Sequence, residues 1–348
     1  MGLSFDDSRL DDPAALGSMD SQLRHLASAG ARVRVANDAM RSAAAESFEA
    51  GRGPRGVIAL GAEARLVRAL LEPVCPVPFV AWPIDGLPGW VGPLDLVVVL
   101  ASEGSEPDLM SAVGEAVRRG AAVVVAANPD SPIADQAASR NTLVLPTRMG
   151  DPLATVVVVL EVLHGLGLGP AVSSQAVADT ADQVAQQCAG PLDISKNPAK
   201  ELALALAEAQ PLVWGGTVLA ARAARRVAEA FRRASGLPAL AADSEALLPV
   251  LASCRPRDTF ADPFDESTPT LAPVLVVLDD RSDDERVRRE RGQLVSVAER
   301  QGVRVFRVPV EHAGESDLER YVELLQRGLF AAAYLGLGLV DDEDAERR

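Results

Sequence analysis

A short apolar run at 94–101, LDLVVVLA, constrains the fold of this chain more than any other feature. It is too short for a typical helix and carries almost no polar residue to face solvent. Four similar runs lie at 56–61, 77–82, 121–128 and 141–146, and segments with a helical pattern separate most of them. Strands that are apolar on both sides need helices on both faces of a parallel sheet. The sequence therefore predicts an α/β domain.

The same alternation of apolar strands and helical segments returns in the second half of the chain. Apolar runs at 210–216, 272–280 and 303–310 read as strands, and a long helical segment covers 217–236. Two α/β units in tandem suggest an internal pseudo-repeat. We predict an N-terminal helical segment at 1–45, a first domain at 46–168, a connector at 169–195 and a second domain at 196–348.

Composition excludes several classes of function. The formal net charge of −15 argues against nucleic acid and against anionic membranes as partners. The chain has no apolar run long enough for a bilayer, and its acidic start lacks the features of a signal peptide. Its three cysteines are scattered without metal-ligand or disulfide spacing. We expect a cytoplasmic protein with no cofactor and no metal.

The loop that follows the run at 94–101 is the first candidate site. Ligands of open parallel sheets gather at the carboxyl ends of strands, and Pro107 suits the first turn of a helix beginning there. Ser102 and Ser105 have the chemistry to bind a ligand or to cap that helix, and we favour capping. We interpret the acids around this loop as a solvated rim rather than a cation site; they are Glu63, Glu103, Glu106 and Asp108.

A glycine pair in the second half marks another strand end. Trp214-Gly215-Gly216-Thr217 ends an apolar run and begins a helix, which is a geometry that can bind an anion. Glycine also permits a close contact between a strand and a helix, and we favour this second interpretation.

The order of motifs resembles a known family, the sugar isomerase (SIS) domain proteins, and specifically the two-domain glucose-6-phosphate/mannose-6-phosphate isomerases. The resemblance rests on the stretches 56–66, 87–109, 120–137, LPTRMGDP at 145–152, 197–216 and 325–344. It implies a homodimer of tandem SIS domains, each with a flavodoxin-like parallel sheet. It also implies reversible aldose–ketose isomerisation of phosphorylated hexoses, which needs a general base, a ring-opening acid/base and a phosphate cradle.

The phosphate cradle of that family is altered in this chain. The first phosphate turn corresponds to 60–64, where Glu63 stands at the hydroxyl position and Gly61 is kept. In the second turn Ala101, Glu103 and Glu106 stand where hydroxyls are expected, and only Gly104 is kept. A carboxylate ~4 Å from a phosphate is repulsive by ~1 kcal/mol even in water. Helix-terminal attraction of ~0.3–1 kcal/mol does not offset three such groups, so we predict that phosphate does not bind.

The catalytic positions implied by the resemblance are altered as well. Arg233 stands at or near the place of the family's carboxylate base, and a guanidinium cannot act as a base. Glu229 and Glu245 are the substitutes we consider. The arginine expected after LPTRMGDP appears as Leu153, which leaves Arg148 as the nearby replacement.

The family's remaining catalytic groups have no counterpart in this chain. The region of the ring-opening histidine, 239–251, contains none, and no lysine follows Lys200.

Three hypotheses of function follow. We favour a catalytically degenerate family member that binds a carbohydrate derivative, such as a sugar or sugar-phosphate-like molecule, or a partner protein. The alternatives are an active isomerase with relocated catalytic residues and a purely structural subunit. The candidate ligand-binding residues are Gly61, Glu63, Ser102, Glu103, Gly104, Ser105, Glu106 and Arg148.

Overall fold

The computed structural model describes residues 3–44, 53–83, 86–148, 150–254, 272–311 and 316–341. It divides into two compact units, here called the first domain (Ala29–Asp179) and the second domain (Met1–Ser28 with Thr180–Arg348). The helical stretch expected at 1–45 thus contributes to both units. The domain boundaries proposed from the sequence stay a prediction.

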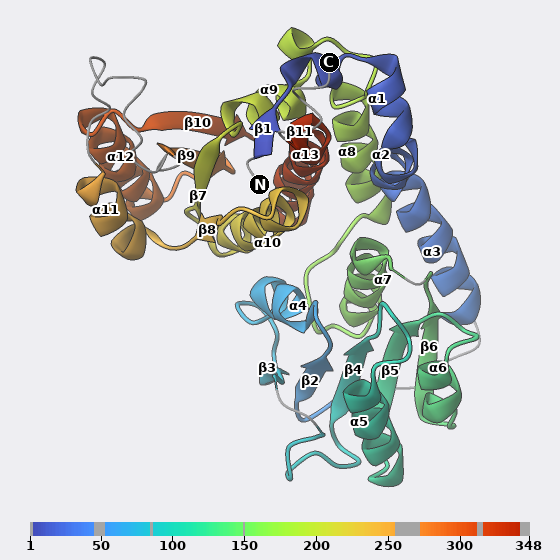
Figure 1. Cartoon of the computed structure of the whole chain (residues 1–348). Helices are drawn as coiled ribbons and strands as arrows, with labels where there is room; N and C mark the ends of the chain where they lie inside the picture. Colours follow the sequence, from blue (N-terminus) through green and yellow to red (C-terminus); the bar gives the residue numbers. More distant parts are fainter. Residues whose placement is uncertain are drawn as a thin grey trace. The chain divides into compact units, whose positions relative to one another are not determined.

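The first domain contains a five-stranded parallel sheet in the order β3-β2-β4-β5-β6 (Figure 1). Its strands are β2 (Val57–Leu60), β3 (Phe79–Ala81), β4 (Leu96–Leu100), β5 (Ala122–Ala127) and β6 (Thr142–Pro146). All neighbouring pairs are parallel, which confirms the α/β fold class and the five predicted strands. The order is that of flavodoxin-like folds.

Helices cover both faces of this sheet, which explains the apolar strands. All five residues of β4 are buried. Val97 and Val99 belong to the core cluster that includes α5 and α6, and the alternate residues point to the opposite face, where α7 contacts β4. The helices are α3 (Ala29–Ala44), α4 (Ala64–Leu71), α5 (Pro107–Arg118), α6 (Pro132–Ala137) and α7 (Pro152–Gly165).

The described part of the second domain repeats the order of the first four strands of this topology. Its parallel sheet has the order β10-β9-β7-β8, so β7 lies between β8 and β9 as β2 lies between β3 and β4. The strands are β7 (Ala209–Gly215), β8 (Leu240–Ala241), β9 (Ala272–Asp279) and β10 (Arg304–Pro309). The predicted pseudo-repeat therefore exists in the fold, although little of it is visible in the sequence.

Two helices cover each face of the second sheet. On one face α11 (Ser244–Ser253) and α12 (Glu285–Arg300) pack on Trp214 and its neighbours. On the other face α10 (Val218–Ser235) and α13 (Asp317–Gly338) lie side by side (Figure 1).

Smaller elements complete the second domain and the chain between the sheets. They are η1 (Asp7–Leu10), α1 (Pro13–Ser18), α2 (Asp20–Ala27), α8 (Ser174–Gln187), η2 (Ile194–Lys196) and α9 (Pro198–Ala205).

The two ends of the described chain are joined within the second domain. Strand β1 (Leu3–Phe5) pairs antiparallel with β11 (Leu339–Asp341). A Cβ at Gly338 would come within 2.3 Å of the Phe5 ring, so this contact requires glycine.

Lys200 fixes the N-terminal segment to the rest of the second domain. Its side chain is fully buried, and its Nζ donates to Asp11 Oδ1 at 2.8 Å. It also donates to the carbonyls of Gly190 (2.8 Å) and Leu192 (2.7 Å) and lies 5.5 Å from the centroid of the Tyr334 ring. Because these contacts use all three ammonium hydrogens, Lys200 is a structural lysine.

Replacing this lysine tests its structural role. We expect Lys200→Met to lower the free energy of unfolding by about 3 kcal/mol, because two backbone carbonyls and one carboxylate lose a charged donor. Lys196 is the matched control, since it is exposed and is the only other lysine of the chain. Lys196→Met should change stability by less than about 0.5 kcal/mol. Chemical denaturation measures both, and equal stabilities would contradict the assignment.

The burial of Cys188 predicts a thiol that does not react. Cys188 is fully buried, and this burial raises its pKa to about 12. Its reactive thiolate is therefore scarce at neutral pH and stays so as the pH rises from 7 to 9. Cys75 and Cys254 are free and half-buried. Titration of the native protein with a chromogenic disulfide should modify at most two thiols, and the third only in denaturant. Rapid native modification of all three would contradict this.

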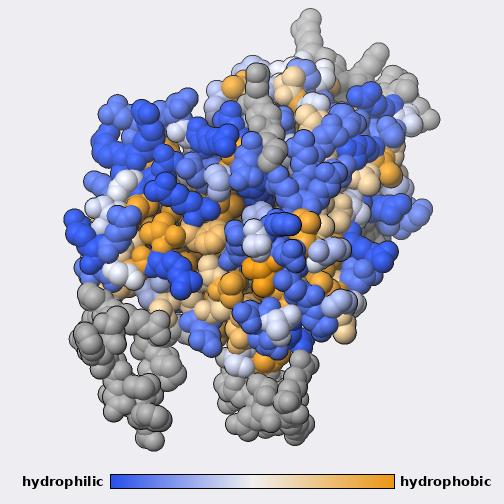
Figure 2. All heavy atoms as spheres, turned by 90° about the horizontal axis from the view of Figure 1, so that it is seen from above, coloured by the Kyte–Doolittle hydropathy of each residue, from blue (hydrophilic) through white to orange (hydrophobic). Residues whose placement is uncertain are grey.

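Within the described segments, none of the helices combines the length and apolarity that a bilayer crossing requires. The face drawn in Figure 2 shows hydrophilic residues over much of the surface, with smaller apolar areas between them.

Candidate functional site

The strand orders place one candidate site at each sheet. In an open parallel sheet, ligands bind beyond the carboxyl ends of the two strands whose crossovers leave in opposite directions. In the first domain these strands are β2 and β4, and in the second they are β7 and β9. The loops that follow them decide what each site can hold.

In the first domain, the loop after β2 lies directly on the end of β4. Gly61 has a φ of +104°, and a Cβ there would lie 2.2 Å from the Leu100 carbonyl oxygen. Glycine is thus required at this position. Glu63 follows at the N-cap position of α4 and is only 7% exposed, so the prediction that it belongs to a solvated rim is wrong.

The loop between β4 and α5 binds its own carboxylate. Glu106 Oε1 accepts a hydrogen bond from the backbone N–H of Glu103 (3.3 Å), and Oε2 accepts one from that of Ser105 (3.0 Å). Gly104, between these residues, has a φ of +74°. Successive backbone N–H groups at the start of a helix form a concave site for an anion. Here the half-buried Glu106 side chain is that anion.

This arrangement corrects our expectation for the serines. Helix α5 begins at Pro107 as predicted, but its N-cap residue is Glu106 and no side chain caps it. Capping by Ser102 or Ser105 is therefore wrong. The Ser102 carbonyl instead accepts the N–H of Gly150 at 2.8 Å, which ties this loop to the loop after β6. Exposed positions around the loop are Glu103, Ser105 and Asp108.

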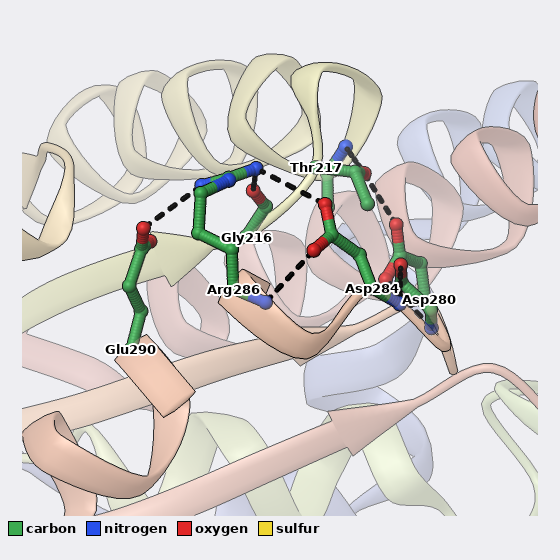
Figure 3. A network of polar contacts seen from close by, with 8 residues as sticks. Gly216, Thr217, Asp280, Asp284, Arg286 and Glu290 are labelled. Atoms are coloured by element: carbon green, nitrogen blue, oxygen red, sulfur yellow. Dashed lines mark hydrogen bonds and ion pairs between the residues drawn. The ribbon is translucent and has the colours of Figure 1, made fainter. Parts of the chain in front are cut away.

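In the second domain, polar contacts join the loops that follow β7 and β9 (Figure 3). The Thr217 hydroxyl donates to Asp280 Oδ2 and accepts from the N–H of Ala220 at 3.1 Å, which caps α10. Asp280 is 8% exposed, and its Oδ1 also accepts the N–H of Ser282 at 3.3 Å. In both domains, a carboxylate that follows the third strand thus accepts hydrogen bonds at the carboxyl edge of the sheet.

Arg286 adds a second bridge across this loop pair. It is 2.9 Å from Glu290 and 3.6 Å from Asp284, and it donates to the Gly216 carbonyl at 3.5 Å (Figure 3). A Cβ at Gly216 would lie 2.4 Å from Val287 Cγ1.

Gly215 shows the same close packing. A Cβ there would lie 2.3 Å from the Ala220 backbone. Close strand–helix packing is therefore the reason for both glycines, as the sequence predicted.

The three candidate catalytic residues lie on α10 and α11 of the second domain. Arg233 has a 78% exposed side chain on α10 and pairs with Glu229 at 2.6 Å. Glu229 also lies 3.5 Å from Arg226, so two guanidinium groups hold its carboxylate. Glu245 is exposed in the first turn of α11, which packs on the opposite face of the sheet from α10. Glu229 and Glu245 therefore do not share a site.

Arg148 borders a cavity of about 250 Å³ inside the first domain. The cavity lies between α3 and the loops after β5 and β6, and its lining includes Arg32, Thr147 and Asp151. Sequence reasoning missed these three residues because the packing of α3 on β6 is a tertiary contact. The described residues contain no group of His, Cys, Asp and Glu side chains able to hold a metal.

Removal of the Glu106 carboxylate tests whether it occupies an anion cradle. We expect Glu106→Ala to free two backbone N–H groups and to bind inorganic phosphate at least tenfold more tightly than the unmodified protein. Asp108→Asn removes the same formal charge from the first turn of α5 without freeing those N–H groups, and should leave phosphate affinity nearly unchanged. Isothermal titration calorimetry at fixed ionic strength measures both. An equal gain in the two variants would mean that net charge alone is responsible.

Comparisons with known proteins agree with the α/β fold. Residues 195–341 match the family model of the bacterial phospho-glucose isomerase C-terminal SIS domain. A search of curated protein sequences finds no match.

Solved structures share the fold over most of the chain. A glucose-6-phosphate isomerase like protein from Thermus thermophilus is 20% identical, with a TM-score of 0.50 over 87% of this chain and 91% of that one. A hypothetical protein from the same organism is 13% identical, with a TM-score of 0.60 over 97% and 94%. The C-terminal domain of glucosamine-fructose-6-phosphate aminotransferase from Francisella tularensis is 12% identical, with a TM-score of 0.61 over 90% and 95%.

Proposed function

We propose that this chain binds a carbohydrate derivative without isomerising it. Its residues 195–341 match the family model of the bacterial phospho-glucose isomerase C-terminal SIS domain. The hydrogen bonds of Glu106 support this proposal most strongly. A phosphorylated hexose would bring a dianion to the N–H groups of Glu103 and Ser105, which the Glu106 carboxylate already occupies. Displacing that carboxylate would leave two like charges close together.

The catalytic positions support the same proposal. Aldose–ketose isomerisation needs a base that moves a proton between two neighbouring carbons. Arg233 cannot act as a base, and Glu229 is held between Arg226 and Arg233. In the second domain, the Thr217 hydroxyl donates a hydrogen bond to Asp280. Each of these groups is committed to a contact within the fold.

The chemistry around the β4–α5 loop favours a ligand without phosphate. Exposed Glu103 and Asp108 offer carboxylate oxygens, which accept hydrogen bonds from sugar hydroxyls or from the ammonium group of an amino sugar. We further propose a cytoplasmic homodimer acting in carbohydrate metabolism, in line with the family resemblance. A partner protein as the ligand is the alternative within this proposal.

A binding panel with a coupled activity assay tests the proposed function. We expect glucose 6-phosphate, fructose 6-phosphate and mannose 6-phosphate neither to raise the melting temperature nor to interconvert. An unphosphorylated or amino sugar should raise the melting temperature in proportion to ln(1 + [L]/Kd).

Turnover of a hexose phosphate would overturn the proposal. Loss of that turnover in Glu229→Gln or Glu245→Gln would identify an active isomerase with a relocated base. Binding of no sugar, phosphorylated or not, would favour a partner-binding or structural subunit.

A further inference from the structure

The cavity beside α3 in the first domain has no role in the function proposed above. Residues of α3 form one wall, and the loops after β5 and β6 form the other. At about 250 Å³ it is smaller than a drug-sized pocket, so it suits a small molecule.

Thr147 brings a buried hydroxyl without a partner to this cavity. The residue is 5% exposed, and its Oγ1 has no hydrogen-bond partner among the described residues. The Thr147 N–H donates to the Ala127 carbonyl at 2.9 Å, which holds the residue at the end of the sheet. Buried hydroxyls in folded proteins are nearly always hydrogen-bonded, so an unpaired one in a cavity wall points to a bound group.

Two arginines line the same cavity but differ in their contacts. Arg32 lies 2.8 Å from Asp151, whose carboxylate also accepts the N–H of Ala154 at the start of α7. Arg148, next to Thr147, is exposed and makes no ion pair with any described residue. Arg148 is therefore the guanidinium that remains for a ligand.

The other lining residues define the class of ligand. The Asn128 side-chain oxygen accepts the N–H of Asp130 at 3.1 Å, so its NH₂ group remains as a donor. Val35, Ala36 and Pro146 supply apolar surface. A guanidinium, an amide NH₂ and a hydroxyl beside apolar walls match a carboxylate with a short hydrocarbon chain, because arginine binds carboxylates through two parallel hydrogen bonds.

We propose that the cavity between α3 and the loops after β5 and β6 binds a small aliphatic carboxylate, with Arg148 and Thr147 as its principal partners. This binding does not require the carbohydrate-binding function proposed above, although the hydrogen bond from the Gly150 N–H to the Ser102 carbonyl joins the loop after β6 to the β4–α5 loop. Acids without an apolar chain should bind more weakly, since they leave the apolar walls without contact.

Butyrate is the probe, and the neutral isostere butyramide is the ligand-side control. Ligand-observed NMR titration of the full chain at constant ionic strength measures the affinities. We expect butyrate to bind at least tenfold more tightly than butyramide. Arg148→Met should weaken butyrate binding at least tenfold, and Arg140→Met should not, because Arg140 is exposed in the same domain but outside the cavity.

Thr147→Val separates a ligand-binding role from a structural one. Valine has nearly the same shape and removes only a hydroxyl without a partner, so the melting temperature without ligand should stay the same or rise. Butyrate affinity should fall severalfold. Equal binding of butyrate and butyramide, or unchanged affinity in Arg148→Met, would overturn the proposal. A fall in stability of Thr147→Val with unchanged butyrate affinity would also overturn it, because the hydroxyl would then have a structural partner.

Discussion

The burial of parallel strands on both faces is the constraint on which the rest of this structure depends. Parallel strands need crossover helices, and those helices cover the sheet on both sides. As a consequence, the carboxyl ends of all strands meet at one edge, where the backbone N–H groups of the following loops point outward. The same rule operates in both domains, with β2 and β4 in one and β7 and β9 in the other. Each sheet thus presents backbone N–H groups that can bind an anion at one edge, whatever side chains the loops carry.

In this chain both edges are occupied by the protein's own acids. Glu106 accepts the N–H groups of Glu103 and Ser105, and Asp280 accepts the Thr217 hydroxyl and the Ser282 N–H. A tethered carboxylate competes well with a free anion because it loses little translational freedom on binding. At both edges, groups of the protein that could bind an anion are thus already in contact with a carboxylate of the same domain.

The cavity bordered by Arg148 differs from those edges in the balance of its charges. The β4–α5 loop and the first turn of α5 carry the acids Glu103, Glu106 and Asp108. In the cavity the Asp151 carboxylate is paired with Arg32, and Arg148 provides the net positive charge. The charges of the two sites thus favour different ligands within one domain.

The sequence alone determined the fold class, most strands of the two parallel sheets and the presence of acids where the family resemblance implies hydroxyls, because apolar periodicity and composition are local properties. It did not predict the pair β1 and β11, which the tertiary structure brings together. Only the tertiary structure decided what those acids do. It showed that Glu106 turns back to its own loop, that Glu63 is buried, and that Ser102 and Ser105 leave α5 uncapped. It also assembled the cavity from α3 and β6, which are about 100 residues apart in the chain. These outcomes depend on packing and on side-chain direction, and the local sequence pattern predicts neither.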